Sequence, residues 1–218
     1  HQLKDIAIAE GAEFRFGISV LGFDASSNQI RALNTSAGPV SGDAFVIAGG
    51  IDSRPLLERL GVRLPMIAVK GYSATAAITA FEHAPFLSVM DETYKVAITR
   101  MGNRMRVAGT AELGTQGMEL RERALGTLLK VAHDWFPYAA SYRLGKFWVG
   151  ARPMLPDGPP VLGATPISNL YLNTGHGSSG WVMATGSARI VADIVAGREP
   201  GIDIDGLTLD RYRTGRGA

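Results

Sequence analysis

The chain has 218 residues, 46% of them hydrophobic and 19% charged, which is ordinary for a globular protein of one or two domains. Its formal charge is +2 and no basic run extends beyond a mildly basic C-terminal tail, so nothing in the sequence supports nucleic-acid binding. The absence of cysteine excludes disulfides and thiolate chemistry, and no apolar stretch reaches the roughly 20 residues that span a bilayer.

The first 63 residues predict an incomplete α/β lobe. Residues 2–10 have helical spacing, but this helix begins in mid-pattern without a capping residue, which indicates that further sequence precedes the chain. The run 45–48 is continuously apolar, as in a strand buried on both faces, and Ser53 is a suitable cap for the short helix after it. We expect strands at 13–23, 29–35 and 43–47, turns at 24–28 and 37–39, and a helix at 54–60.

The central segment, 64–150, predicts a mostly antiparallel sheet with one long helix. Gly102 and Asn103 lie at the centre of a predicted hairpin turn. Helical spacing over 118–136 ends at Pro137, which cannot continue a helix. Strands are expected at 65–78, 86–90, 95–101, 105–109 and 142–149.

The last segment predicts a return to the first lobe. It has a proline-dense loop at 151–163, a short buried strand at 170–172, and a helix at 180–196 that ends at Gly197. The element order therefore predicts an α/β plus α+β fold, in which 64–150 are inserted into a scaffold made by 1–63 and 151–218.

Ala48, Gly49 and Gly50 follow the predicted buried strand. In open α/β sheets, ligands bind at the carboxyl ends of strands, and glycine lets the backbone approach them closely. A tight strand-to-helix turn would need the same residues, so both interpretations stay open at this point.

The stretch NTGHGSSGW, residues 173–181, places glycines and serines in front of the last helix. The backbone N–H groups of 177–180 would project from a helix N-terminus, where partial positive charge favours an anion. A serine nucleophile is excluded, because GxSxG requires glycine where Trp181 stands. His176 is more typical of a hydrogen-bonded structural histidine than of a catalyst.

Arg152 lies in the run WVGARPMLPDG, residues 148–158, between a predicted strand end and a proline-stiffened loop. A guanidinium held in this way can bind a carboxylate through two charge-assisted hydrogen bonds, although a surface ion pair would use the same residue. The four histidines have no HExxH-like spacing, so no metal site is predicted.

Four motifs together resemble bacterial D-amino-acid dehydrogenases, a quinone-linked group within the FAD-containing D-amino-acid oxidase/glycine oxidase superfamily. The motifs are KGYS at 70–73, DETYK at 91–95, and the runs at 148–158 and 173–181. Proteins of this superfamily begin with a βαβ unit whose GxGxxG motif binds the FAD pyrophosphate. No such motif occurs here, so the chain resembles the C-terminal portion of such an enzyme, although the resemblance extends over essentially all 218 residues.

The resemblance implies three segments: 1–63 as a partial FAD-binding lobe, 64–150 as a substrate-binding domain, and 151–218 as the returning FAD lobe with a flavin-contacting loop. It implies that Arg152 binds the substrate carboxylate, with Tyr72, Tyr94 and His176 beside the substrate. It assigns no catalytic side chain and no metal. The implied cofactor-binding residues are Val20, Ala48, Gly49, Gly50, Gly175, His176, Gly177, Ser178, Ser179 and Gly180.

The implied reaction is FAD-dependent oxidative deamination of a D-amino acid to a 2-oxo acid and ammonia. The implied electron acceptor is a quinone or the respiratory chain. The implied location is the cytoplasm, with peripheral attachment to the inner face of the bacterial membrane as an option. Two alternatives stay open: a related enzyme for glycine, sarcosine, proline or hydroxyproline, and a non-catalytic segment that needs a separate FAD-carrying part.

Overall fold

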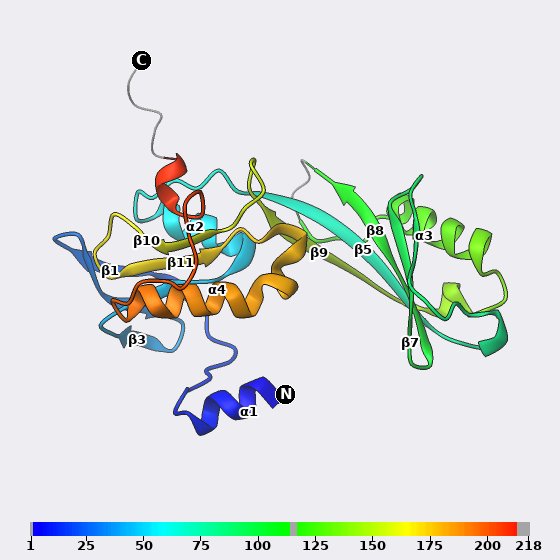
Figure 1. The fold of residues 1–218 in the computed structure, drawn as a ribbon, viewed down its shortest axis with the longest axis horizontal. Coiled ribbons are helices and arrows are strands. Elements are labelled where there is room, and N and C mark those ends of the chain that lie inside the picture. Colours follow the sequence, from blue (N-terminus) through cyan, green and yellow to red (C-terminus); the bar gives the residue numbers. More distant parts are fainter. Residues whose placement is uncertain (1, 114–116, 213–218) are drawn as a thin grey trace, which may run out of the picture. The chain divides into compact units, whose positions relative to one another are not determined.

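The computed structural model describes residues 2–113 and 117–212, which form two compact units (Figure 1). Unit 1 comprises 1–64, 161–173 and 185–218, and unit 2 comprises 65–160 and 174–184. The sequence places segment boundaries after 63 and after 150, whereas the compact units change after 64 and after 160. Unit 2 also includes the glycine-rich loop and the first turn of the last helix.

Unit 1 contains a three-stranded antiparallel sheet, β1-β2-β3, and a second three-stranded sheet, β10-β11-β4. β4 and β11 run parallel, with Phe45 opposite Leu170 and Ile47 opposite Leu172. The elements are α1 Gln2–Ala9, β1 Val20–Ser26, β2 Gln29–Thr35, β3 Gly38–Ser41, β4 Phe45–Ile47, α2 Ser53–Glu58, β10 Val161–Ala164, β11 Leu170–Thr174 and α4 Gly180–Val195.

The strand expected at 13–23 is wrong in its first half, because β1 begins only at Val20. Phe14 and Phe16 alternate as in a strand, but they are exposed and stack on each other instead of pairing with a neighbouring strand. The following turn is shorter than expected: Ser27 and Asn28 both have positive φ, as a two-residue hairpin turn requires. The short strand β3 was not expected.

Two further expectations in unit 1 need correction. Val46 is 46% exposed whereas Phe45 and Ile47 are buried, so β4 is buried on one face only. Ser53 is the first residue of α2, and the N-cap position belongs to Asp52. The last helix packs on β10 through Ile190 and Val191, which contact Leu162, as the ribbon also shows (Figure 1).

Unit 2 is built on a five-stranded sheet with the order β6-β7-β8-β5-β9, and all neighbouring strands in it pair antiparallel, as expected. The hairpin turn at Gly102 and Asn103 is confirmed, because Met101 pairs with Arg104. The elements are β5 Ile67–Ala77, β6 Val89–Asp91, β7 Val96–Met101, β8 Arg104–Glu112, α3 Glu122–Trp135 and β9 Lys146–Met154.

Helix α3 covers one face of this sheet (Figure 1). Leu128, Val131 and Ala132 are fully buried against side chains of β5, β7 and β8, including Val96 and Val107. The helix begins four residues later than its apolar spacing predicts, and Arg121 is its N-cap residue. This face provides the core of unit 2.

The segment around β9 differs most from the expectation. The predicted strand at 142–149 begins with a 3-10 turn, Tyr142–Leu144, and the proline-dense stretch expected as a loop supplies the end of β9 and the strand β10. Pro153 is tolerated because β9 is an edge strand, where a residue without an N–H group need not break the ladder. Arg152 therefore lies inside a strand, opposite Val69, and not in a loop.

Within the described ranges, no helix combines the length and the apolar character that crossing a membrane requires.

Candidate active site

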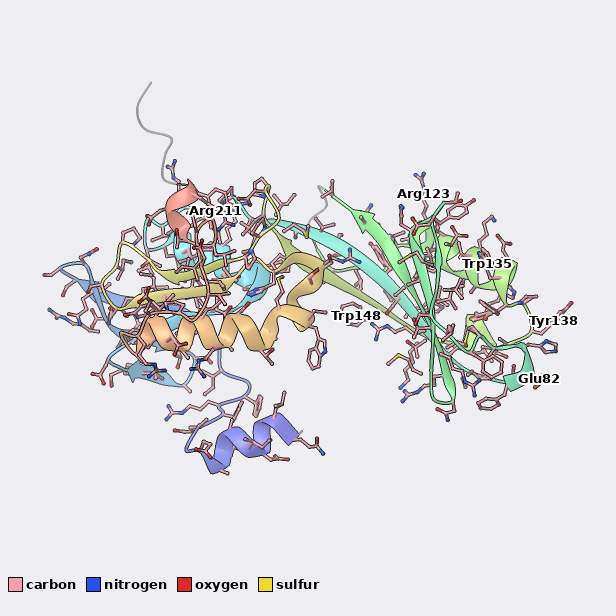
Figure 2. All side chains as sticks on the ribbon, in the orientation of Figure 1. Glu82, Arg123, Trp135, Tyr138, Trp148 and Arg211 are labelled. Atoms are coloured by element: carbon pink, nitrogen blue, oxygen red, sulfur yellow. The ribbon has the colours of Figure 1, made fainter. Side chains whose placement is uncertain are left out.

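Strand β5 divides its side chains between the two faces of the unit 2 sheet. Residues directly opposite each other on paired strands share a face, and neighbours along a strand alternate. Tyr72 and Ala76 therefore point to α3, and both belong to the core beneath it. Gly71 and Ser73 point to the other face, which we call the open face, together with β9 residues Gly150 and Trp148. Figure 2 labels Trp148.

Arg152 lies on this open face and its guanidinium is held by the backbone. Its Nη1 donates to the carbonyl oxygens of Lys70 at 3.4 Å and Thr110 at 3.3 Å. No other hydrogen bond or ion pair of Arg152 occurs among the residues that the structure describes. The Nε–Nη2 edge is therefore available for a bidentate contact with a carboxylate.

The glycine-rich loop lies beside the end of β9. A Cβ atom on Gly177 would lie 2.6 Å from Sδ of Met154, and Met154 shares the open face with Arg152 two residues earlier. Gly175 and Gly177 have φ of 82° and 56°, which side chains other than glycine rarely adopt. The structure thus brings the predicted flavin-contacting loop and the predicted carboxylate ligand together within unit 2.

The start of α4 is tighter than the sequence indicates. A 3-10 turn, Gly177–Ser179, precedes the helix, and the N–H group of Ser179 donates to the carbonyl oxygen of His176 at 3.2 Å. Of the four amides predicted to face a ligand, that of Ser179 is therefore already engaged. Partial burial lowers the pKa of His176 below 6.5, so its neutral form is favoured near neutral pH.

A polar network occupies the helix-side face of β5 beneath Arg152. Glu112 accepts from the Tyr72 hydroxyl, pairs with Arg121 at 3.0 Å, and lies 3.7 Å from Nζ of Lys70. The Lys70 side chain is 2% exposed and donates to the carbonyl oxygen of Gly117 at 3.1 Å. Burial, and next the hydrogen bond to Glu112, raises the pKa of Tyr72.

The two tyrosines expected beside the substrate do not share the face of Arg152. Tyr72 is 2% exposed and belongs to the core under α3. Tyr94 follows a turn in which its N–H group donates to Asp91, and the ammonium of Lys130, a residue of α3, lies 5.2 Å from its ring centroid. We therefore do not include either tyrosine in the proposed substrate site.

A shallow groove of about 410 Å³ continues the open face away from Arg152. Arg104, Arg106 and Lys146 contribute three cations, and none of them forms an ion pair with a carboxylate in the described part of the chain. The positive potential of this face favours the approach of an anionic substrate. The remaining lining residues are Ser73, Thr75, Met101 and Trp148.

The remaining predicted cofactor residues belong to unit 1. Val20 begins β1 and pairs with Thr35. Ala48 and Gly49 follow β4, and Gly50, with φ of 59°, begins the 3-10 turn that leads into α2. The backbone therefore turns sharply at the carboxyl end of a parallel strand, as expected for either a ligand loop or a plain turn.

The described residues contain no group of three or more His, Asp or Glu side chains that could hold a metal ion. Sequence reasoning missed three residues that shape the surroundings of Arg152: Gly71, Thr110 and Glu112. The isolated glycine inside a strand pattern was the available signal for Gly71, because such a glycine often marks close approach of another group. No local pattern marks Thr110 or Glu112.

The same fold occurs in solved structures of enzymes that oxidise amines. Glycine oxidase from Geobacillus kaustophilus superposes with a TM-score of 0.79 and 26% identity, over 93% of this chain and 54% of that protein. L-proline dehydrogenase from P. horikoshii superposes with a TM-score of 0.80 over 96% of this chain and 57% of that protein, and at 16% identity it shows the fold alone. The fold of this chain is therefore that of the glycine oxidase structure.

The DAO family model, described as FAD dependent oxidoreductase, matches residues 1–194. The chain belongs to this family. It is 45% identical to D-amino acid dehydrogenase of Granulibacter bethesdensis over 211 residues, and 44% identical to that of Vibrio vulnificus over 211 residues. Each match covers 97% of this chain and 50% of the relative, so the chain spans about half the length of the curated relatives it matches.

Proposed function

We propose that this chain supplies the substrate-binding part of an FAD-dependent dehydrogenase that converts D-amino acids to 2-oxo acids and ammonia. The observation that supports this most is Arg152, whose guanidinium is anchored by two carbonyl oxygens and keeps one bidentate edge available. The curated relatives at 44–46% identity bear the name D-amino acid dehydrogenase.

In the proposed reaction, the substrate loses two electrons and two protons to give an imino acid, which water hydrolyses to the 2-oxo acid and ammonia. FAD, when bound, supplies the two-electron acceptor. Arg152 binds the α-carboxylate and so fixes the orientation of Cα. Because an α-amino acid is a zwitterion without net charge, the cations of the groove favour an orientation that directs its carboxylate to this face, and they do not raise its local concentration.

Two observations support the proposal that the loop before α4 accommodates a bound polar group such as a flavin. Gly175, which is buried, and Gly177, which is half-buried, lack a side chain at positions where one would be strained, and at Gly177 it would also collide with Met154. The side-chain Oδ1 of Asn173 is buried and has no hydrogen-bond partner in the described residues. A buried oxygen without a hydrogen-bond donor is unfavourable, and a bound cofactor can provide a donor for Oδ1 of Asn173. Within unit 2, residues 174–180 would contribute to holding FAD, and residues 48–50 of unit 1 stay predicted cofactor residues on the basis of the family resemblance.

The test has two parts. The absorbance spectrum of the purified chain, with and without added FAD, shows whether these residues bind the cofactor without a further segment. The FAD-loaded protein is then assayed with matched D- and L-amino acids and an artificial electron acceptor, with 2-oxo acid and ammonia quantified. We expect oxidation of the D-isomers; equal or greater oxidation of the L-isomers would reject the proposal.

The similarity to glycine oxidase favours one second candidate, an enzyme that acts on glycine or another small amine. Assays of the same FAD-loaded protein with glycine, sarcosine, proline and hydroxyproline separate the two candidates. A higher kcat/KM for any of these than for D-amino acids would favour the second.

We further propose a quinone or respiratory-chain acceptor, reached by peripheral attachment of unit 2 to a membrane. Phe86, Leu87 and Leu144 are 88%, 79% and 87% exposed. The guanidinium of Arg100 lies 5.9 Å from the Phe86 ring centroid, so a cation accompanies an exposed apolar side chain. Co-sedimentation with anionic phospholipid vesicles tests this, and the expected result is binding that weakens in the double variant Phe86→Ala, Leu87→Ala. No binding to such vesicles would reject it.

A further inference from the structure

The guanidinium of Arg152 rests on a glycine of the neighbouring strand. Arg152 is opposite Val69 in the β5–β9 ladder, and its side chain extends along the open face until it lies above Gly71. A Cβ atom on Gly71 would lie 2.6 Å from Cζ and 2.7 Å from Nη1 of Arg152, and closer still to Nη2. Any other residue at position 71 therefore displaces the guanidinium.

Glycine at this position is not required by the backbone. Gly71 is absent from the residues with positive φ, so an alanine could adopt its conformation, and glycine inside a strand is itself unfavourable. The atoms that an alanine Cβ would meet belong to the far end of a flexible side chain. The need for glycine thus comes from the position of Arg152 and not from folding.

A strained bulge fixes the other side of the guanidinium. Between the pairs Lys70–Glu112 and Tyr72–Gly109, strand β8 has one residue more than β5, and Thr110 in this bulge has a φ of 61°. A left-handed conformation at a β-branched residue is unfavourable and persists only where its surroundings hold it. Here it turns the Thr110 carbonyl oxygen toward Nη1 of Arg152.

We propose that Gly71 is a positioning residue for substrate binding: its bare Cα lets Arg152 lie flat on β5, with Nη1 on the two carbonyl oxygens and the Nε–Nη2 edge directed to the substrate carboxylate. This inference rests on the proposed function. It goes beyond that function, because it explains the orientation of Arg152, which binds the substrate, by the absence of a side chain at Gly71, which does not touch the substrate.

The matched control is Gly150, which pairs directly with Gly71 on the adjacent strand. A Cβ atom on Gly150 would meet the Trp148 ring, 2.5 Å from Cζ2 and 2.7 Å from Cζ3, and not Arg152. Gly71→Ala and Gly150→Ala are therefore the same chemical change at paired positions, and they displace different side chains.

The experiment compares wild type, Gly71→Ala and Gly150→Ala as FAD-loaded proteins, using a D-amino acid and its carboxamide. We expect Gly71→Ala to raise KM for the amino acid about tenfold to a hundredfold, with unchanged flavin content and melting temperature. The preference in kcat/KM for the acid over the amide should fall by about the same factor. Gly150→Ala displaces Trp148 of the groove and not Arg152, so it should leave the preference for the acid over the amide within about twofold of the wild-type value.

A double-mutant cycle completes the test: in an Arg152→Ala background, Gly71→Ala should change kcat/KM by less than about twofold. The inference is overturned by an unchanged KM in Gly71→Ala, by an equal loss of the preference for the acid over the amide in both glycine variants, or by a full effect that persists without Arg152. A wild type that is inactive on D-amino acids rejects the proposed function instead, and an active wild type that tolerates Gly71→Ala rejects this inference alone.

Discussion

The two faces of the unit 2 sheet use the same strands for different purposes. On the face under α3, β5 presents Tyr72 and Ala76 to a continuous apolar core. On the open face the same strand presents Gly71 and Ser73, with Trp148 and Arg152 beside them on β9. Because successive side chains of β5 point to opposite faces, the residues that stabilise unit 2 lie on one face and those proposed to bind the substrate lie on the other.

The largest effect on stability is expected from the centre of the helix face. Leu128 of α3 is fully buried, so Leu128→Ala removes packed apolar surface and leaves a cavity. It should lower the free energy of unfolding by about 2–5 kcal/mol. KM for a D-amino acid, measured well below the melting temperature, should stay within about twofold of wild type. Denaturant unfolding and steady-state kinetics check this, and a large increase in KM at unchanged stability would contradict the separation of the two faces.

A smaller effect in the same direction is expected from Tyr72→Phe. The change removes the hydroxyl that donates to Glu112, while Lys70 and Arg121 still accompany the carboxylate. The free energy of unfolding should fall by about 1–3 kcal/mol, with KM unchanged. If KM rises while stability is retained, Tyr72 contacts the substrate, as the family resemblance implied, and our placement of it in the structural face is refuted.

The smallest effect concerns His176, in the loop beside the end of β9. Because burial lowers its folded-state pKa below 6.5, the unfolded chain binds a proton more readily than the folded one. The stability that depends on neutral His176 is complete above pH 6.5, and it is lost as the pH falls from there through the folded-state pKa. His176→Gln should therefore show a shallower fall in melting temperature than wild type over this window. Parallel curves for the two proteins would show that His176 does not titrate in this way.

Most strands of unit 2 and the hairpin that joins β7 to β8 could be predicted from the sequence, because apolar alternation and the turn at Gly102 and Asn103 are local signals. The glycine-rich loop at 173–181 and Arg152 could be found through the family resemblance. The strand residues within 151–163 could not be predicted, because a proline such as Pro153 argues against a strand. A strand can contain Pro153 here only because β9 lies at the edge of the sheet, which the local sequence does not indicate. At Phe14 and Phe16 the alternating pattern predicted a strand that does not form, because no neighbouring strand in the described part of the chain pairs with this segment.

The contacts of Arg152 were beyond local prediction for a different reason. They join residues 70, 110 and 152, which are brought together only by the register of three strands and by a bulge at Thr110. Spacing along one segment carries no information about such a register. The family resemblance pointed to Arg152, and the structure added Gly71 and Thr110 as its surroundings.

The most direct measurement of the central claim is the kinetics of Arg152→Ala in the FAD-loaded protein, with Tyr72→Phe as the comparison from the other face. Loss of a charge-assisted bidentate contact should lower kcat/KM for D-amino acids by about 10²–10³, mainly through KM, with flavin content and melting temperature unchanged. Tyr72→Phe should show the reverse pattern, lower stability with unchanged KM. An Arg152→Ala protein that keeps the wild-type KM would contradict the assignment of the open face to substrate binding.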